Sequence, residues 1–202
     1  MALTRLGGNQ SINLATNTTG TLGVANGGTG LTSGTTNQFL KFTGSTTVAS
    51  SALGDVGKVL QVVSSSGANV TSTSSTSFST NMTVSITPSA ATSKVLVLHA
   101  PPSAIYLSNN SNYGHTAVFR ETGGSDTNIT TSGHNSTWGV YRLSSGNYMS
   151  GSAIEILDSP NTTASIDYKI RVKVDNASLT MTYGHDGSQA SMSTLTVMEI
   201  GA

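Results

Sequence analysis

The stretch Ile166-Asp167-Tyr168-Lys169-Ile170-Arg171-Val172-Lys173-Val174 decides the fold class of this chain. Every even-numbered position in it is apolar or aromatic, and every intervening position is charged. Successive side chains of a β-strand point to opposite faces of the sheet, so a period of two places one face in a core and the other in water. The stretch therefore predicts a half-buried β-strand.

Further runs of this kind occur from residue 57 onward. Val95-Leu96-Val97-Leu98 is continuously apolar, which predicts a strand covered on both faces, and residues 82–86 alternate until Pro88 ends the run. No segment has a convincing period of 3.6 residues. The eight or nine expected strands predict an all-β domain over residues 56–202, a jelly-roll-like β-sandwich. The remaining expected strands span residues 58–63, 116–121, 138–143, 148–157, 179–183 and 193–200.

The last expected strand, Leu195-Thr196-Val197-Met198-Glu199-Ile200, carries apolar residues on both faces near its end. An isolated sandwich keeps one face of such a strand in water. Two interpretations follow. The second face contacts another subunit, or the strand is central and lies under a loop.

The composition excludes several classes of partner. The chain has 202 residues, a formal net charge of zero, no cysteine and only 9% charged residues, against about 25% in globular proteins. It offers no basic stripe for nucleic acid and no cationic face for a membrane. A surface this poor in charge favours self-association, so we expect an obligate oligomer. The sequence shows no signal peptide and no run of 18 apolar residues, so we expect neither secretion by that route nor membrane insertion.

Residues 1–55 differ in composition from the rest of the chain. They are rich in Gly, Thr and Asn and are expected to form an N-terminal arm. Within it, residues 24–36 contain no charge. They do not match a phosphate-binding loop, because a dinucleotide fingerprint starting at Gly28 requires glycine where Ser33 stands, and no Gly-Lys-Ser/Thr occurs in the chain. The arm is either a flexible linker or an extended segment ordered by packing against other chains.

The sequence offers little support for an enzyme. Glycoside hydrolysis normally requires two suitably spaced carboxylates, and the closest pairs are Glu121 with Asp126 and Glu155 with Asp158. Glu155 is expected to face solvent, because it lies between two isoleucines of an expected strand. There is no Gly-x-Ser-x-Gly or His-Glu-x-x-His motif. We therefore expect no catalytic residue and no cofactor.

The four histidines, His99, His115, His134 and His185, lie far apart in the sequence and are expected in loops or at rims. His185-Asp186-Gly187 predicts a turn, because Asp-Gly supplies the positive φ that such turns require. A trimer could gather three copies of one histidine around an axial metal. The single chain, however, predicts no metal site.

Two loops rich in Asn, Ser and Gly, residues 103–115 and 122–138, carry aromatic residues suited to contact with sugars. Sugars stack on aromatic faces and hydrogen-bond to neutral side chains, and loops can hold such contacts without disturbing a core. A core position for the single tryptophan and a strand position for the last tyrosine are the alternatives. The candidate glycan-binding residues are Tyr106, Tyr113, Trp138 and Tyr148.

The segment Val24-Ala25-Asn26-Gly27-Gly28-Thr29-Gly30 resembles a signature that recurs in tail fibre proteins of tailed bacteriophages. Ser85-Ile86-Thr87-Pro88, Ser93-Lys94-Val95-Leu96-Val97 and the terminal Leu195-Thr196-Val197-Met198-Glu199-Ile200 look like parts of distal domains in fibres and appendages of marine and cyanobacterial phages. Each motif is short, but together they span most of the chain.

The resemblance implies a homotrimeric virion protein, assembled in the host cytoplasm. Its arm would attach to other virion proteins, and its C-terminal domain would bind a host surface glycan or envelope protein. With 202 residues the chain has no extended shaft, so a head, neck or tail decoration or adaptor protein is the alternative. The residues that the resemblance implies for attachment are Leu3, Leu6, Ile12 and Leu14.

Overall fold

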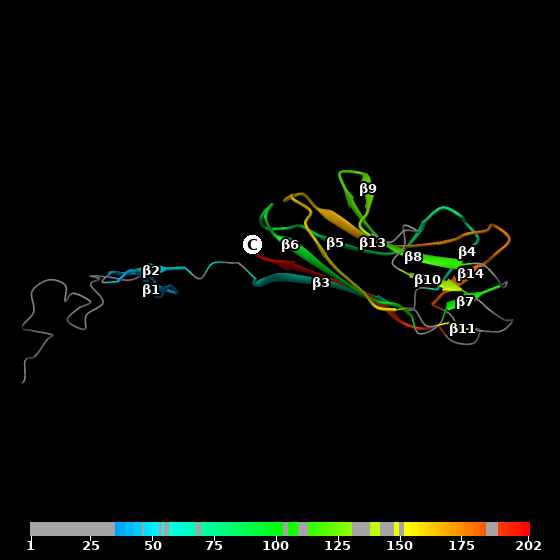
Figure 1. The fold of residues 1–202 in the computed structure, drawn as a ribbon, viewed down its shortest axis with the longest axis horizontal. Helices are drawn as coiled ribbons and strands as arrows, with labels where there is room; N and C mark the ends of the chain where they lie inside the picture. Colours follow the sequence, from blue (N-terminus) through cyan, green and yellow to red (C-terminus); the bar gives the residue numbers. More distant parts are fainter. Residues whose placement is uncertain are drawn as a thin grey trace, which may run out of the picture. The chain divides into compact units, whose positions relative to one another are not determined.

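The chain divides into two compact units, Met1–Gly54 and Asp55–Ala202. Every regular element in the described part of the chain is a β-strand, and every strand pair is antiparallel, which confirms the predicted all-β class (Figure 1). The computed structural model describes residues 35–45, 47–52, 54, 57–67, 70–102, 105–108, 113–130, 138–141, 148–149, 152–184 and 190–202.

The described part of the first unit is a hairpin of β1 (Phe39–Gly44) and β2 (Thr47–Ser51). No strand was expected before residue 57, because apolar residues are sparse there. Every residue of β1 is exposed, including Phe39 at 61% and Phe42 at 69%. A lone two-stranded hairpin is marginally stable at best in water, because it has no core of its own.

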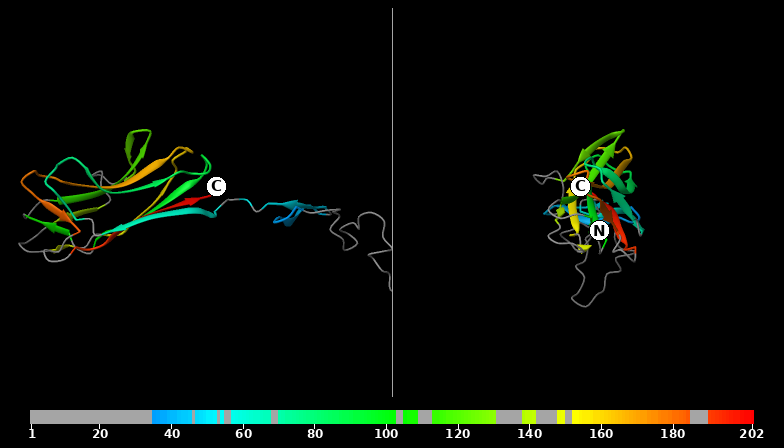
Figure 2. Two further views of the ribbon diagram at one scale, coloured as in Figure 1. Left: turned by 180° about the vertical axis from the view of Figure 1, so that it is seen from behind. Right: turned by 90° about the vertical axis from the view of Figure 1, so that its right-hand side faces the viewer.

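Two sheets of the second unit form a β-sandwich, one of four strands and one of five, because β9 (Ser125–Asn128) also pairs with β8. The first sheet has the order β12-β6-β15-β3, and the second has the order β10-β8-β13-β5. Figure 2 shows β3 and the last strand running side by side in one layer. The strands are β3 (Val59–Gly67), β5 (Ser79–Ile86), β6 (Lys94–Ala100), β8 (Tyr113–Thr122), β10 (Trp138–Tyr141), β12 (Ile154–Asp158), β13 (Ile166–Val174) and β15 (Ser193–Ile200).

The connectivity of these eight strands is that of a jelly roll. Numbered one to eight along the chain, they give the order 6-3-8-1 in the first sheet and 5-4-7-2 in the second. The chain therefore crosses between layers repeatedly, as two interleaved Greek keys require. The predicted jelly-roll-like sandwich is confirmed at this level of topology.

A third, smaller sheet with the order β11-β7-β14-β4 lies at one end of the sandwich (Figure 1). Each of its strands comes from a different connection between sandwich strands, so four separate loops build it together. We call it the end sheet. Its strands are β4 (Thr71–Thr73), β7 (Ile105–Leu107), β11 (Tyr148–Met149) and β14 (Met181–Tyr183).

The alternating stretch of residues 166–174 is β13, and it joins two hydrophobic cores. Ile166, Tyr168 and Ile170 are fully buried in the core between the two sandwich sheets. Val172 and Val174 belong to a second core, which they form with residues of β7 and β14 beneath the end sheet. The inward face of one strand thus connects the sandwich to the end sheet.

Two strand predictions require correction. Residues 148–157 were expected as one strand, but β11 and β12 belong to different sheets. The physical reason is that β11 pairs with β7 in the end sheet, whereas β12 pairs with β6 at the edge of the sandwich. The apolar run in β6 was expected to be covered on both faces, but Leu96 and Leu98 are only half-buried, on the outer face of the first sheet.

Candidate functional site

The end sheet positions two of the four predicted glycan-contact residues. Tyr106 in β7 is the register partner of Tyr148 in β11 and, on its other side, of Thr182 in β14. Thr182 is in turn paired with Ser72 of β4, and the two hydroxyl oxygens lie 2.9 Å apart. Tyr106 and Thr182 are half-buried and Ser72 is exposed, so this row lies on the outer face of the end sheet.

The other two predicted residues belong to the second sheet of the sandwich. Tyr113 begins β8 and is 45% exposed, while Trp138 begins β10 opposite Thr116. The structure therefore pairs Tyr106 with Tyr148 and places Tyr113 and Trp138 on neighbouring strands. The roles of all four stay predictions. The proposed attachment residues Leu3, Leu6, Ile12 and Leu14 lie outside the described residues, as do His134 and the turn predicted at residues 185–187.

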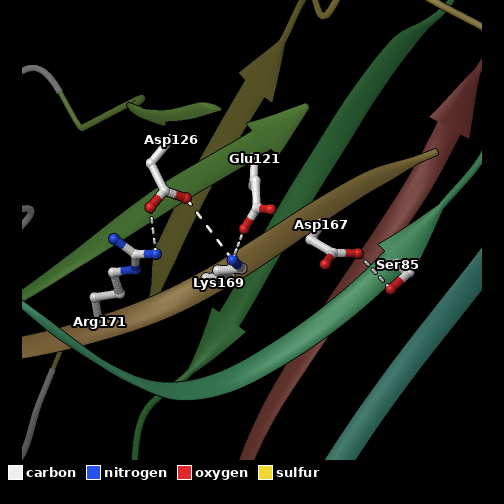
Figure 3. Close-up of polar contacts among 6 residues, drawn as sticks. All are labelled: Ser85, Glu121, Asp126, Asp167, Lys169 and Arg171. Carbon is white, nitrogen blue, oxygen red and sulfur yellow. Dashed lines mark hydrogen bonds and ion pairs between the residues drawn. The ribbon is translucent and has the colours of Figure 1, made fainter. Parts of the chain in front are cut away.

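The outward face of β13 carries a network of charged side chains (Figure 3). The Lys169 ammonium contacts the Glu121 carboxylate and lies 3.8 Å from Oδ1 of Asp126. Arg171 donates a hydrogen bond from Nη2 to Oδ2 of Asp126 at 2.5 Å. At the other end of the strand, the Ser85 hydroxyl donates to Oδ1 of Asp167 at 2.6 Å.

A tight hairpin brings Asp126 onto this face. Gly123 and Gly124 connect β8 to β9 (Ser125–Asn128) with φ angles of 60° and 81°, the left-handed region that a two-residue hairpin turn requires. The turn sets Glu121 and Asp126 as direct cross-strand partners. Two carboxylates this close repel each other, and the two cations on β13 offset that repulsion.

Aromatic rings extend the same face toward the end sheet. Arg171 lies over the ring of Phe119, with Cζ 4.7 Å from the ring centroid, and Lys173 lies over Phe78 at 5.0 Å. The two rings contact each other edge to face at 5.2 Å. The cations of β13 are thus held by carboxylates or by aromatic faces, which suits a stabilising surface better than an anion-binding site.

The two carboxylate pairs considered for glycoside hydrolysis lie in different surroundings. Glu121 and Asp126 both pair with cations on an open sheet face. Glu155 is exposed, as expected, whereas Asp158 lies on the opposite face of β12. An acid and a base must flank one bond, and residues on opposite faces of a strand cannot do so.

Asp158 instead joins the two sandwich sheets. Both of its carboxylate oxygens accept hydrogen bonds from Nη1 of Arg120 at 2.8 Å, and Oδ2 also accepts one from the Tyr168 hydroxyl at 2.7 Å. Burial and the neighbouring Asp158 raise the pKa of Tyr168, so the phenol stays protonated and donates. Asp158 thus gives the Tyr168 hydroxyl a hydrogen-bond acceptor, while the Tyr168 ring lies in the core.

Two of the histidines are buried in strands, which corrects the expectation of loop or rim positions. Nε2 of His99 is 2.7 Å from the Tyr183 hydroxyl, and Nδ1 is 2.9 Å from the carbonyl oxygen of Thr194. Nε2 of His115 is 2.7 Å from Oδ1 of Asp175. Burial lowers the pKa of His99, although the Thr194 contact partly opposes that shift, so the neutral ring is favoured.

Glu199 is a buried carboxylate that the sequence did not single out. Oε1 accepts hydrogen bonds from the backbone N–H and the hydroxyl of Ser89, at 2.7 and 2.6 Å. Oε2 accepts one from Nε2 of Gln61 at 2.6 Å. Burial raises the pKa of Glu199, but these hydrogen bonds, with Ser93, outweigh it and lower the pKa to about 2. The Glu199 carboxylate thus links the turn after β5 to the first sheet through hydrogen bonds.

Two kinds of structural feature are absent from the described residues. No group of three or more His, Cys, Asp or Glu residues in them is arranged to hold a metal ion. No helix there is long and apolar enough to cross a membrane.

No protein-family model matches the sequence, and no curated protein matches it. Among solved structures, the chain is similar to a VP2 subviral particle of infectious bursal disease virus, with 11% identity and a TM-score of 0.36. It is also similar to a structure of the Gx strain of that virus, with 12% identity and a TM-score of 0.32. Each match covers 80% of this chain and 42% of the other, so the chain spans less than half of those proteins.

Proposed function

We propose that this chain is a structural protein of a bacteriophage particle, a tail fibre or short appendage that is mounted through its N-terminal arm. The tail-fibre resemblance of residues 24–30 supports this proposal, and jelly rolls are common among virion proteins. The arm supplies a second argument. A strip of Gly and Thr offers too little apolar surface for a core of its own, so we expect it to pack against other chains.

The observation that carries receptor binding is the position of the end sheet within the second unit. The chain enters the sandwich beside its C-terminus, where Gly57 N–H donates to the Gly201 carbonyl at 2.6 Å and Gly201 N–H donates to the Lys58 carbonyl at 2.8 Å. The end sheet lies at the opposite end of the sandwich (Figure 1). A domain held at its point of entry presents the end sheet outward.

The chemistry of that end suits a neutral glycan. Tyr106 supplies an aromatic face, and Ser72 and Thr182 supply hydroxyl groups in the same cross-strand row. The described residues of the end sheet include no charged side chain. Stacking on aromatic rings with neutral hydrogen bonds is how proteins bind uncharged sugar rings, and a binding role of this kind requires no catalytic residue.

A glycan array tests the chemistry. Tyr106→Ala and Thr182→Ala are each expected to weaken binding, Tyr106→Ala by at least about tenfold, whereas Tyr106→Phe keeps the ring and most of the affinity. Equal binding by wild type and both alanine variants would reject this site. Release of reducing sugars from host envelope by the wild-type protein would instead make the chain an enzyme.

Immunogold labelling of residues 56–202 on intact particles tests the location. Label on fibres or at the tail tip is expected, together with inhibition of adsorption by the free protein. Label over the head would contradict the proposal.

The second candidate is a decoration or adaptor protein of the head, neck or tail. The half-exposed apolar outer face of the first sheet favours it, because such a face suits contact with protein. Label over the head or neck, with no effect of free protein on adsorption, is the outcome expected from this alternative.

A further inference from the structure

The outer face of the first sheet carries an apolar row that crosses all four strands. The backbone register sets Leu157 of β12 opposite Leu96 of β6, Leu96 opposite Met198 of β15, and Met198 opposite Val62 of β3. Leu157 is 56% exposed and Val62 55%, while the two central side chains are half-buried. We call this surface, with the rows on either side of it, the apolar face.

The neighbouring rows extend the apolar face. On one side of the central row, Ile200 is paired with Val59, which is 54% exposed. On the other side only Leu98 is apolar, and the row continues through Thr196 of β15 to Ser64 of β3. The second sheet contrasts with this surface, because its outward side chains on β13 are charged (Figure 3). A single sandwich in water normally keeps both outer faces polar, so the apolar face calls for a partner.

Two charges flank the central row, and their placement indicates which partner fits. Lys94 of β6 is paired with Ile200 on one side of the row, and Glu155 of β12 is paired with Leu98 on the other side. Both side chains are exposed, and neither has a hydrogen-bond or ion-pair partner among the described residues. Each lies one row, about 7 Å, from the centre.

We propose that the apolar face binds the same face of a second copy of this chain, about a two-fold axis that runs along the central row. Such an axis keeps each strand's position across the sheet and exchanges the two sides of the row. Lys94 of one copy therefore meets Glu155 of the other, and the reverse pair forms by symmetry. A self-complementary surface of this kind is what a two-fold interface requires.

The area of the apolar face sets the expected strength of the dimer contact. Four strands about 4.8 Å apart, with on average about seven residues at about 3.4 Å each, give a projected area on the order of 500 Å² per copy. Two copies together reach roughly 1,000 Å², the lower limit for a specific interface. The dimer contact is therefore expected to dissociate on dilution.

A charge swap in the full-length chain tests the pairing. Lys94→Glu alone and Glu155→Lys alone place like charges together, so each is expected to weaken association at least tenfold in sedimentation velocity. The double variant Lys94→Glu/Glu155→Lys restores the opposite charges and is expected to return within about threefold of wild type. Thr83→Glu, an exposed change on the second sheet, is the matched control and leaves association unchanged.

The mass separates this contact from any association through the arm. At a concentration near the wild-type dissociation constant, each single variant is expected to bring the mass close to half that of the fully associated wild type, whatever number of copies the arm holds. A wild-type mass that the single variants do not change overturns the proposal, as does a fall to one third. A double variant that stays as weak as the single variants also overturns it.

Discussion

Glu199 shows how one residue can hold three segments of this fold together. Its buried carboxylate receives hydrogen bonds from Ser89 in the turn after β5 and from Gln61 in β3, while its own strand is β15. Nε2 of Gln61 lies within hydrogen-bond distance of the Thr87 carbonyl as well. A charge taken out of water is tolerated only when its hydrogen bonds are replaced, and here they are.

Replacement of Glu199 by Gln is expected to lower the free energy of unfolding by roughly 1–3 kcal/mol at pH 7, because an uncharged amide accepts these bonds less strongly. The folded pKa of about 2 lies below the ordinary value of 4.5, so the ionised form stabilises the fold fully above pH 4.5 and progressively less as the pH falls toward 2. Urea unfolding at pH 7 and pH 3 measures both effects.

The difference between wild type and Glu199→Gln should therefore shrink between pH 4.5 and pH 2. Asp167→Asn is the control, because that carboxylate lies on the outward face and accepts its bond from Ser85. It is expected to change stability by less than about 1 kcal/mol. A pH-independent difference for Glu199→Gln would contradict the assignment of a low pKa.

Asp158 supports a second prediction at this scale. Asp158→Ala removes the partner of both the Arg120 guanidinium and the Tyr168 hydroxyl, and is expected to lower the free energy of unfolding by about 3 kcal/mol, since a largely buried cation loses its counter-charge. Tyr168→Phe loses one hydrogen bond and is expected to change it by about 1 kcal/mol. Denaturant titration of both variants gives the order, and the reverse order would reject the cluster as an inter-sheet link.

At the scale of elements, β13 has two faces with different energetic roles. Its inward residues contribute to both hydrophobic cores, whereas its outward residues form ion pairs on a sheet surface. Burial of an aliphatic side chain stabilises a fold far more than a surface ion pair does, because water and salt screen the pair.

Neighbouring substitutions in β13 measure this difference. Ile170→Ala is expected to lower the free energy of unfolding by about 2–5 kcal/mol, through lost burial and the cavity left behind. Lys169→Ala is expected to lower it by no more than about 1 kcal/mol, and less in 1 M salt. Guanidinium cannot be used here because it is itself a salt, so urea titration is the measurement. Equal effects of the two variants would show that the charged face does more than stabilise a hairpin.

At the scale of the whole molecule, the chain joins two units with unequal cores. The second unit has two clusters of buried side chains. The described strands of the first unit leave Phe39, Leu40 and Phe42 exposed. In the proposed assembly, these are the apolar side chains of the arm that we expect to become buried against other chains.

The double variant Phe39→Ser/Phe42→Ser tests that dependence. The thermal midpoint of the sandwich is expected to stay within about 1 °C of wild type, because neither residue belongs to its cores. The assembly is expected to lose mass in light scattering, in proportion to the number of copies that the arm holds. The homotrimer stays a prediction, and a wild-type mass of 20.6 kDa at all concentrations would contradict it.

The strands with strict alternation were predictable from sequence, whereas the strands of the end sheet were largely not. β7 and β4 have three residues each and β11 has two, too few for a period to show. Only part of the candidate site was predicted, because the strands that carry it are too short to show a pattern. Tyr106 and Tyr148 were singled out by their composition, but only cross-strand register makes them neighbours.

The sequence by itself determined the all-β class, the inward face of β13 and the exposure of Glu155, because alternation is a local property that each strand carries alone. The tertiary structure decided the partners of each strand, the burial of His99, His115 and Glu199, and the apolar row on the first sheet. Gln61 and Glu199, for example, are 138 residues apart in the chain and meet only through pairing of β3 with β15. Contacts at such separation depend on how the sheets assemble, and no local pattern records them.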